Sequence, residues 1–447
     1  MRIPLPARLT AVAVMALSLS VRANAEVWTL DHAVRTALEH SPDARIARLR
    51  IDGADALIEQ ARSAWMPQLS LSGRYTETNS PMMAFGSILN QRAFGPTIDF
   101  NHPGTIDDLN VTGTIAYNLY GGGRPTAGLQ AAKAGARAAQ FDLKAARHEL
   151  GVEVVKAYLN VRKAREAVVA LRAGVDAYDA AVKVARARFE AGSLLKADLL
   201  SLEVQRSQTR EMLVAARHGA QLAAHAFYYV LGIREQPGAI LEFQPHDPAL
   251  AAMTDPKTRD VSLRPELEGV KERVRAAEAM VRAARGARRP VVNAFASAQA
   301  DKGYQTGRDA NSWMAGVTVD MNVFDGGLTA GKIRLAKAEL AQAQEMERKL
   351  ELGLDLQVQQ ASQALDDARE RLSVSAQSVA QAQESASLTR ARFDKGDLLT
   401  ADLIGVESRL IEARMRRFVA EADERQAVAE LRNAVGYAPV EITQSHP

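Results

Sequence analysis

Two aspartates in a duplicated motif are the clearest candidates in this chain for side chains with a chemical role. Asp198 lies in the segment 185–203, ARARFEAGSLLKADLLSLE, and Asp402 lies in the segment 389–407, TRARFDKGDLLTADLIGVE. The two positions are 204 residues apart (402 − 198), and the aligned Phe, Gly, Leu and Glu residues keep the same offset. If several copies of these carboxylates converged around a narrow pore, they would favour cations. Acids in a first helical turn are also favourable for ordinary dipole reasons, and the sequence leaves both roles open.

Patterns that would indicate an enzyme or a metal centre are weak. His218 and His225 share a helix position but have no carboxylate or cysteine partner at ligand spacing, so we expect no metal site. The glycine run at 121–123 is not a phosphate loop, because no Lys-Ser or Lys-Thr follows it. No Ser/His/Asp order or paired-carboxylate pocket stands out. We therefore expect no catalytic residues and no cofactor.

Residues 1–25 are typical of a secretory signal peptide. Arg2 and Arg8 precede an apolar run at 9–19, and small residues at 23–25 provide a cleavage site. The segment carries three arginines and no acid, so its removal takes the formal net charge from +3 to zero (3 − 3). The net positive charge of the full sequence comes from this segment alone and therefore does not indicate a nucleic-acid partner. The chain has no cysteine, so disulfides do not hold this exported protein together.

Two heptad patterns lead up to the aspartate motifs. Apolar residues recur about every 3.5 residues from Leu150 to Phe189, and the pattern returns from Leu354 to Phe393. Such seams predict long helices with a left-handed supercoil. A single helix of this kind would be about 100 Å long, which excludes an ordinary compact domain. The predicted long helices and their shorter return helices cover 124–191 with 194–231 and 328–395 with 398–435.

Alternating apolar and polar residues predict a pair of strands ahead of each long helix. Leu69, Leu71 and Tyr75 alternate with polar residues, for example, and Val317 and Val319 do the same in the second repeat. The predicted strands cover about 68–80, 110–120, 291–300 and 312–324.

The two repeats differ by an insertion. Pro67 aligns with Pro290 at an offset of 223, whereas Tyr120 aligns with Phe324 at an offset of 204, a difference of 19 residues. Loops tolerate insertions better than packed elements do, so we expect a variable loop within 76–109. The predicted units are the first repeat at 26–234, a linker at 235–261, the second repeat at 262–436 and a tail at 437–447.

The strand count has a consequence for assembly. Four strands cannot close a barrel, and an open sheet edge is not tolerated in lipid. An eight-stranded barrel is filled by side chains, so three chains with twelve strands make the smallest plausible assembly with a water path. The predicted fold class is mainly α with a membrane β-barrel. Duplicated helix–β-hairpin–helix repeats would form a long α-helical barrel plus a 12-stranded β-barrel as a homotrimer.

Three sets of residues occur in the same order in both repeats, at the strand-to-helix junctions, the helix tips and the repeat ends. They are Tyr120, Gly121, Gly122 and Gly123 with Phe324, Asp325, Gly326 and Gly327; Arg188, Phe189, Gly192 and Asp198 with Arg392, Phe393, Gly396 and Asp402; and Gly232 with Gly436. In this order the motifs resemble the outer membrane efflux protein family, the TolC-like outer-membrane factors of Gram-negative bacteria. The resemblance covers essentially all of the chain after the predicted signal peptide.

The resemblance implies a homotrimeric channel-tunnel in the cell outer membrane that projects into the periplasm. It would contact outer-membrane lipid through its barrel and dock a periplasmic adaptor (membrane fusion) protein and an inner-membrane pump of RND or ABC type. The implied function is a passive exit duct of a tripartite efflux or type I secretion system. Drugs, metal ions, aromatic acids and polypeptides all remain candidate cargo.

The resemblance also assigns roles at the helix tips. Family aspartates that follow the tip glycine of the second repeat constrict the closed entrance, and one of them corresponds to Asp402. The next family aspartate corresponds to Gly405 and a nearby family arginine to Leu398, so half of that aspartate ring is missing here. We expect the periplasmic gate to comprise Asp198, Asp402 and Phe393.

The remaining candidates are turn and junction residues. Gly192, Gly396, Arg188 and Arg392 are predicted to form the helix-tip turns and the adaptor contact, although such arginines are also typical of a solvated helix face. A second set of glycines is predicted to bend the chain from strand to helix, namely Gly122, Gly123, Gly326 and Gly327.

A soluble periplasmic coiled-coil scaffold is the alternative function. In that case the alternating segments would form small dimerisation hairpins, which need no apolar outward face. The polarity of the strand faces therefore distinguishes the two hypotheses.

Overall fold

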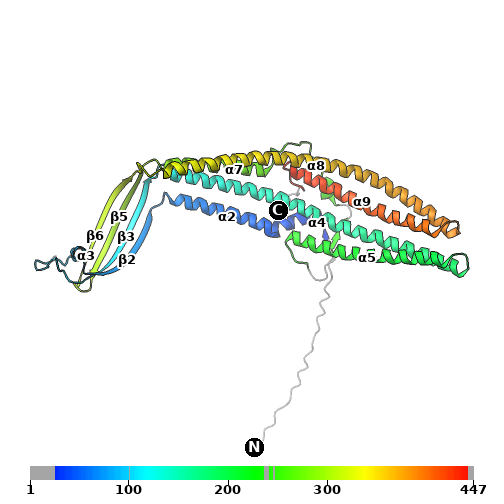
Figure 1. The fold of residues 1–447 in the computed structure, drawn as a ribbon, viewed down its shortest axis with the longest axis horizontal. Coiled ribbons are helices and arrows are strands. Elements are labelled where there is room, and N and C mark those ends of the chain that lie inside the picture. The colour runs from blue at the N-terminus through cyan, green and yellow to red at the C-terminus, as the bar shows by residue number, and fades with distance from the viewer. Residues whose placement is uncertain (1–25, 100, 236–240, 245–246, 441–447) are drawn as a thin grey trace, which may run out of the picture.

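The chain forms an elongated molecule with a β-sheet at one end and long helices that extend away from it (Figure 1). The predicted signal peptide and the last seven residues of the predicted tail lie outside the described residues. The computed structural model describes residues 26–99, 101–235, 241–244 and 247–440.

One antiparallel sheet contains four strands in the order β2-β3-β5-β6. The four strands confirm the predicted hairpins, but β3 begins four residues before the predicted start (110 − 106) and β6 ends at Asp320 instead of 324. The residues added to β3 read Ile-Asp-Asp-Leu, so they pair in the ladder without showing apolar alternation. The strands are β2 (Gln68–Thr78), β3 (Ile106–Tyr120), β5 (Val291–Gly303) and β6 (Arg308–Asp320).

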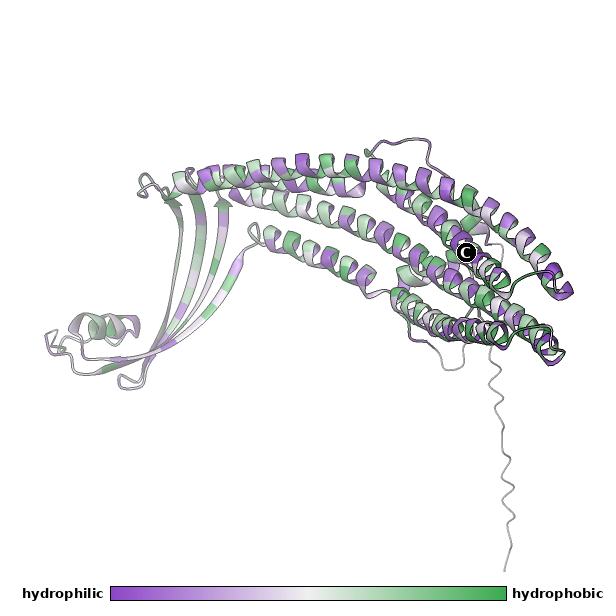
Figure 2. Ribbon diagram, turned by 45° about the vertical axis from the view of Figure 1, so that its right-hand side comes forward, coloured by the Kyte–Doolittle hydropathy of each residue, from purple (hydrophilic) through white to green (hydrophobic). Residues whose placement is uncertain are grey.

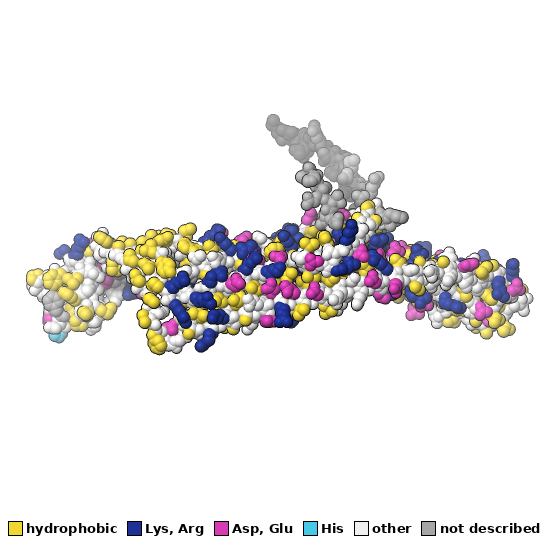
Figure 3. Space-filling model, turned by 90° about the horizontal axis from the view of Figure 1, so that it is seen from above, with side chains coloured by type: hydrophobic (Ala, Val, Ile, Leu, Met, Phe, Trp, Pro, Cys, Tyr) yellow, Lys and Arg dark blue, Asp and Glu magenta, His cyan; other side chains and the backbone are white. Residues whose placement is uncertain are grey.

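The two faces of this sheet differ in polarity. Ile115 lies opposite Leu69 on one face, whereas Thr112 lies opposite Ser72 and Gln299 on the other. We call these the apolar sheet face and the polar sheet face. Hydrophobic side chains gather toward this end of the molecule, whereas charged side chains cover the helices (Figure 3). The apolar sheet face also carries several exposed side chains, namely Leu71, Trp313, Val317 and Val319.

Two helical hairpins form the opposite end of the molecule. They pair α4 (Arg124–Glu190) with α5 (Lys196–Leu231), and α8 (Leu328–Lys395) with α9 (Thr400–Ala434). In α8 the heptad positions from Leu354 to Phe393 are buried or half-buried, and most positions between them are exposed. Apolar and polar residues accordingly alternate along the helices (Figure 2). None of the helices in the described ranges is both long and apolar enough to cross a membrane.

Shorter helices run beside α4 between the sheet and the hairpins. These are α1 (Leu30–His40), α2 (Pro42–Ser63) and α7 (Pro265–Gly286). The break between α1 and α2 falls at Ser41, whose hydroxyl oxygen accepts from the Asp43 amide at 3.3 Å. Proline at the first position of α2 suits a helix start, because that position needs no amide donor.

The predicted linker contains regular structure that the sequence pattern did not indicate. Strand β4 (Leu241–Phe243) pairs in parallel with β1 (Glu26–Trp28), and a short helix, α6 (Pro248–Ala252), follows it. Asp247 directly precedes α6. Its buried carboxylate accepts hydrogen bonds from the Leu30 amide at 2.6 Å and the Tyr158 hydroxyl at 2.7 Å. Burial raises the pKa of the Tyr158 hydroxyl, with the Asp247 carboxylate adding to the shift.

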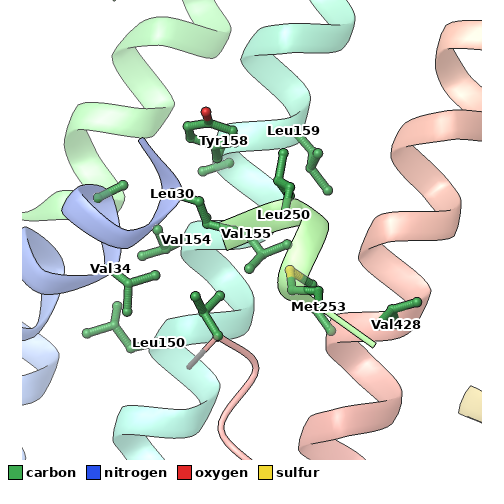
Figure 4. Packing of buried hydrophobic residues seen from close by; sticks show 14 of the residues in the cluster. Leu30, Val34, Leu150, Val154, Val155, Tyr158, Leu159, Leu250, Met253 and Val428 are labelled. Atoms are coloured by element: carbon green, nitrogen blue, oxygen red, sulfur yellow. The ribbon is translucent and has the colours of Figure 1, made fainter. Parts of the chain in front are cut away.

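The largest apolar core surrounds this linker. Leu30 and Val34 of α1 pack on Val154 and Tyr158 of α4, and Leu250 of α6 covers them (Figure 4). The core therefore joins the linker and the N-terminal elements to both helical hairpins.

The expected variable loop contains a helix, α3 (Pro81–Asn90). Its proline and glycine content suggested irregular structure, but proline stands at the helix start. Ala84 and Ile88, four positions apart on one side of α3, are buried. The connection predicted as a variable loop therefore contains a helix that the sequence analysis did not indicate.

Candidate functional site

The two hairpins end in turns with the same hydrogen-bonding pattern. In the first repeat the amide of Gly192 donates to the carbonyl of Phe189 at 2.9 Å, and the amide of Ser193 donates to the carbonyl of Arg188 at 2.8 Å. Both bonds recur in the second repeat around Gly396, at 3.0 Å each. The two glycines have φ angles of 74° and 89°. This Schellman geometry would strain any residue that carries a Cβ.

Asp198 and Asp402 lie in the first turns of the return helices, with Leu195 and Leu399 as the N-cap residues. Asp402 is exposed and Asp198 is half-buried. Neither carboxylate forms a hydrogen bond or an ion pair with another described residue. Both are stabilised by the helix dipole, which favours negative charge at an N-terminus. They remain available at the end of the molecule farthest from the sheet.

Arg188 extends from the first tip to the second. Its guanidinium carbon lies 5.6 Å from the ring centroid of Phe393, and its Nη1 donates to the Phe393 carbonyl at 3.3 Å. A Cβ added at Gly396 would be 3.3 Å from the Arg188 Nη2. The counterpart Arg392 is exposed and contacts the carbonyl of Asp397 in its own turn at 3.5 Å. The two arginines predicted for adaptor contact therefore differ, since only Arg188 ties the tips together.

Phe393 occupies a different environment from the one its predicted gate role requires. Its side chain is 1% exposed and packs with Leu199 and Leu403, whereas its counterpart Phe189 is 38% exposed. A large apolar ring gains more by burial between the tips than by facing water. Phe393 therefore belongs to the packing between the hairpins and lies away from any surface that could line an entrance.

A groove separates the two tips. It is lined by residues of both turns, including Arg188, Ser193, Leu195, Asp198, Gly396 and Asp397. Asp402 lies outside this groove, so the two predicted gate aspartates face different surroundings. Among the described residues, no group of three or more His, Asp or Glu side chains could hold a metal ion.

An arginine–glutamate pair that the sequence analysis missed closes each hairpin near its tip. Arg390 binds Glu407 through Nε and Nη2, with Nη2 2.6 Å from Oε2, and the Glu407 side chain is 3% exposed. In the first repeat Arg186 contacts Glu203 through one nitrogen at 2.6 Å, and the Glu203 side chain is 27% exposed. The hydrogen bond to Glu407 raises the pKa of Arg390. The 17-residue separation, repeated at the offset of 204, is the signal that could have revealed both pairs.

The predicted junction glycines lie between strand and helix in both repeats. Gly123 and Gly327 are the N-cap residues of α4 and α8, and all four junction glycines have positive φ angles. A Cβ at Gly122 would lie 2.6 Å from the carbonyl oxygen of Gly286, at the end of α7. Nothing lies within 4 Å of a Cβ at Gly326. The first junction is thus packed against α7, whereas the second is open in the single chain.

Comparisons with known proteins agree with this architecture. The sequence profile described as outer membrane efflux protein matches residues 33–233 and 261–437, which are most of the two repeats. The outer membrane efflux protein BepC of Brucella suis biovar 1 (strain 1330) is 25% identical over 422 residues, covering 91% of this chain and 85% of that protein.

Solved structures share the fold at lower identity. The CmeC outer membrane channel of Campylobacter jejuni has a TM-score of 0.77 and 16% identity, covering 100% of this chain and 96% of that one. The outer membrane protein VceC of Vibrio cholerae has a TM-score of 0.76 and 19% identity, covering 92% of this chain and 96% of that one.

Proposed function

Because the chain belongs to the outer membrane efflux protein family, we propose that three copies of it assemble into one channel-tunnel. The chain is an outer-membrane efflux channel of tripartite systems and extends into the periplasm. TolC-like channels form trimers. With four strands from each copy, the proposed homotrimer has a barrel of twelve strands (3 × 4) and a tunnel built from the long helices.

The sheet carries this proposal. Its outer strands are β2 and β6, whose free edges would leave backbone donors and acceptors unpaired in a bilayer. Pairing β6 of one copy with β2 of the next satisfies both edges and closes the barrel. The apolar sheet face then contacts lipid, and the polar sheet face lines a water-filled lumen.

The helices offer a second surface for the same assembly. In the single chain α8 packs mainly on α7 and α9, and its outer flank exposes large apolar side chains. In a closed ring this flank would face the first repeat of the neighbouring copy, so that the barrel and the tunnel close together. The exposed side chains on this flank include Leu335, Met346, Leu352, Leu356 and Val374.

The tips are the proposed periplasmic gate and docking surface. Three copies of Asp402, exposed at the far end of the tunnel, would favour cations at a narrow entrance. Gly192 and Gly396 would form the turns that a periplasmic adaptor contacts, with Arg392 exposed beside them. An inner-membrane pump of RND or ABC type would supply the energy, since the channel itself has no catalytic role.

The mass and location of the mature particle test the proposal. Cell envelopes would be fractionated, the protein extracted in mild detergent, and the protein mass of the particle measured by light scattering. A trimer from the outer-membrane fraction is expected. A soluble monomer or dimer would contradict the assembly. Family membership and the apolar sheet face already argue against the soluble scaffold considered from the sequence.

A further inference from the structure

The two strand hairpins end in connections of very different length. β2 and β3 are joined by residues 79–105, whereas β5 and β6 are joined by residues 304–307 alone. The longer connection holds α3 at the end of the sheet opposite the long helices (Figure 1). In the proposed channel this end is the outer mouth.

Gln91, directly after α3, anchors the helix to the sheet. The side chain is fully buried, and its amide nitrogen donates to the Asp107 carbonyl at 2.7 Å and to the Asp108 carboxylate at 3.0 Å. Its amide oxygen accepts from the Thr306 hydroxyl at 2.7 Å. A Cβ at Gly303 would fall 2.1 Å from the same oxygen, so the absence of a side chain there makes room for Gln91.

These anchors identify the face of the sheet on which α3 sits. Asp108 alternates with Asn110 and Thr112 along β3, and Asn110 pairs with Asp301 of β5. All four residues belong to the polar sheet face, which lines the lumen of the proposed barrel. Gly303 shares that face, since it lies two residues after Asp301. The helix is therefore fixed on the lumenal side, away from the face that lipid would contact.

Several large apolar side chains on and beside α3 are exposed to solvent in the single chain. Met82 is 85% exposed and Met83 is 56% exposed, although Ala84 and Ile88 on the other side of α3 are buried. Phe94 is 53% exposed and makes an edge-on contact with Phe85, with ring centroids 6.1 Å apart. Exposed apolar side chains of this size, so close together in the sequence, are typical of an interaction surface.

We propose that the α3 helices of the three copies meet at the outer mouth and form an apolar constriction across the lumen. This inference rests on the proposed trimer, because threefold symmetry brings three identical lumenal patches toward one axis. Contact between the patches would remove Met82, Met83 and Phe94 from water. Apolar constrictions of this kind gate channels by dewetting. The channel would then have an outer barrier separate from the tip aspartates.

Single-cysteine crosslinking tests the proposal, because the chain has no cysteine of its own. Met82→Cys, Met83→Cys and Phe94→Cys would each be prepared as detergent-extracted particles and treated with a short bismaleimide. Covalent dimers are expected from each variant, leaving one chain of each trimer unpaired. Lys302→Cys is the matched control, because it is exposed at the same end of the sheet but on the opposite face. It should remain monomeric on the gel.

The mass of each particle separates the possible outcomes. Particles of trimer mass that yield no dimer at any of the three positions would overturn the constriction while leaving the proposed trimer intact. Particles without trimer mass would instead contradict the proposed function. A fluorophore on Met83→Cys that brominated lipid quenches in vesicles would also overturn the proposal, since lipid and not a second α3 would then cover the patch.

Discussion

The long helices α4 and α8 have nearly the same length and the same heptad seam, but they differ in how much of their surface is buried. Of the 67 residues of α4, 21 are buried, whereas only 8 of the 68 residues of α8 are buried. The cause is position, since α4 contacts α1, α2, α5, α7 and α9, while α8 packs mainly on α7 and α9. One sequence template thus produces an interior helix and an edge helix, and the exposed flank of the edge helix fits a contact with a neighbouring copy in the proposed trimer.

The hairpins also differ in charge at equivalent contacts. Arg210 binds both carboxylate oxygens of Asp179 at 2.9 Å, whereas its counterpart Arg414 donates to the amide oxygen of Gln383 at 2.9 Å. At this position the first repeat has the stronger charged contact. Near the tips the second repeat has it, because its arginine–glutamate pair is the more buried one. Duplication has therefore preserved the geometry of each contact while its electrostatic strength has changed independently in the two copies.

The largest effect is expected from charges on the apolar sheet face, which both repeats contribute to. Ile115→Arg in β3 and Val317→Arg in β6 should each abolish assembly in the outer membrane. An arginine facing lipid at the midplane costs about 2–4 kcal/mol, and the homotrimer would carry the cost three times. The amount of trimer in outer-membrane fractions measures the effect.

Thr318→Arg is the matched control for this prediction, because Thr318 is exposed and adjacent to Val317 but lies on the polar sheet face. It should assemble normally. Correct insertion of both Ile115→Arg and Val317→Arg would show that neither hairpin faces lipid, and the barrel assignment would then be wrong for both repeats.

The arginine–glutamate pairs near the tips give the second comparison. Glu407→Gln removes the charge of a buried carboxylate and should lower the free energy of local opening at the second tip by about 2 kcal/mol. Glu203→Gln removes a more exposed, single contact, and we expect a loss of about 1 kcal/mol or less. Hydrogen exchange of the tip amides measures both. Equal losses would mean that burial does not distinguish the two pairs.

The sequence indicated the elements of this fold better than it indicated their neighbours. The heptad spacing identified the face that α8 buries. Gly192 and Gly396 marked turns that require a left-handed backbone conformation. Periodicity within one helix contains no information about contacts between the two hairpins. For that reason the burial of Phe393 beneath Arg188 was unexpected.

Short elements were missed for a related reason. The pairing of β1 with β4 joins segments more than 200 residues apart (241 − 26 = 215), and three residues are too few to show alternation. Helix α3 was hidden because Pro81 and Gly86 suggested a loop. Gln91 gave no signal in the sequence, since its importance depends on Asp108 and Gly303 from other strands.

Acid should destabilise α7 more than it destabilises α2, the counterpart of α7 in the first repeat. Glu272 of α7 is buried, which raises the pKa of its carboxyl, but its contacts with Arg137 and Arg275 outweigh burial and hold that pKa below its ordinary value of 4.5. The unfolded carboxyl therefore binds a proton first as pH falls, and the stabilisation is present above pH 4.5 and lost as pH falls through the lower native pKa. At the aligned position α2 carries Leu49 (272 − 223).

Protection factors from hydrogen exchange between about pH 5 and pH 3 measure this difference. Protection of α7 should fall over this range, while protection of α2 should change less. Glu272→Gln should reduce the pH dependence of α7, and the part that remains would come from the other carboxylates paired at α7, such as Asp142 with Arg273. A wild-type α7 that keeps its protection throughout would contradict a role for the ion pair in holding α7 on α4.

The smallest effect is expected at the proposed gate, where the comparison is between Asp402 and Asp198. Asp402 is exposed, so Asp402→Ala should lower the cation selectivity of the pore in planar bilayers. Asp198→Ala should have less effect, because Asp198 is half-buried in the groove between the tips. An exposed charge acts through water, so the change should amount to about 1 kcal/mol, or about fivefold in the permeability ratio. It should also shrink as salt rises, because screening shortens the reach of exposed charges. Reversal potentials in a KCl gradient measure both variants. An unchanged reversal potential for Asp402→Ala at low salt would place that carboxylate away from the axis.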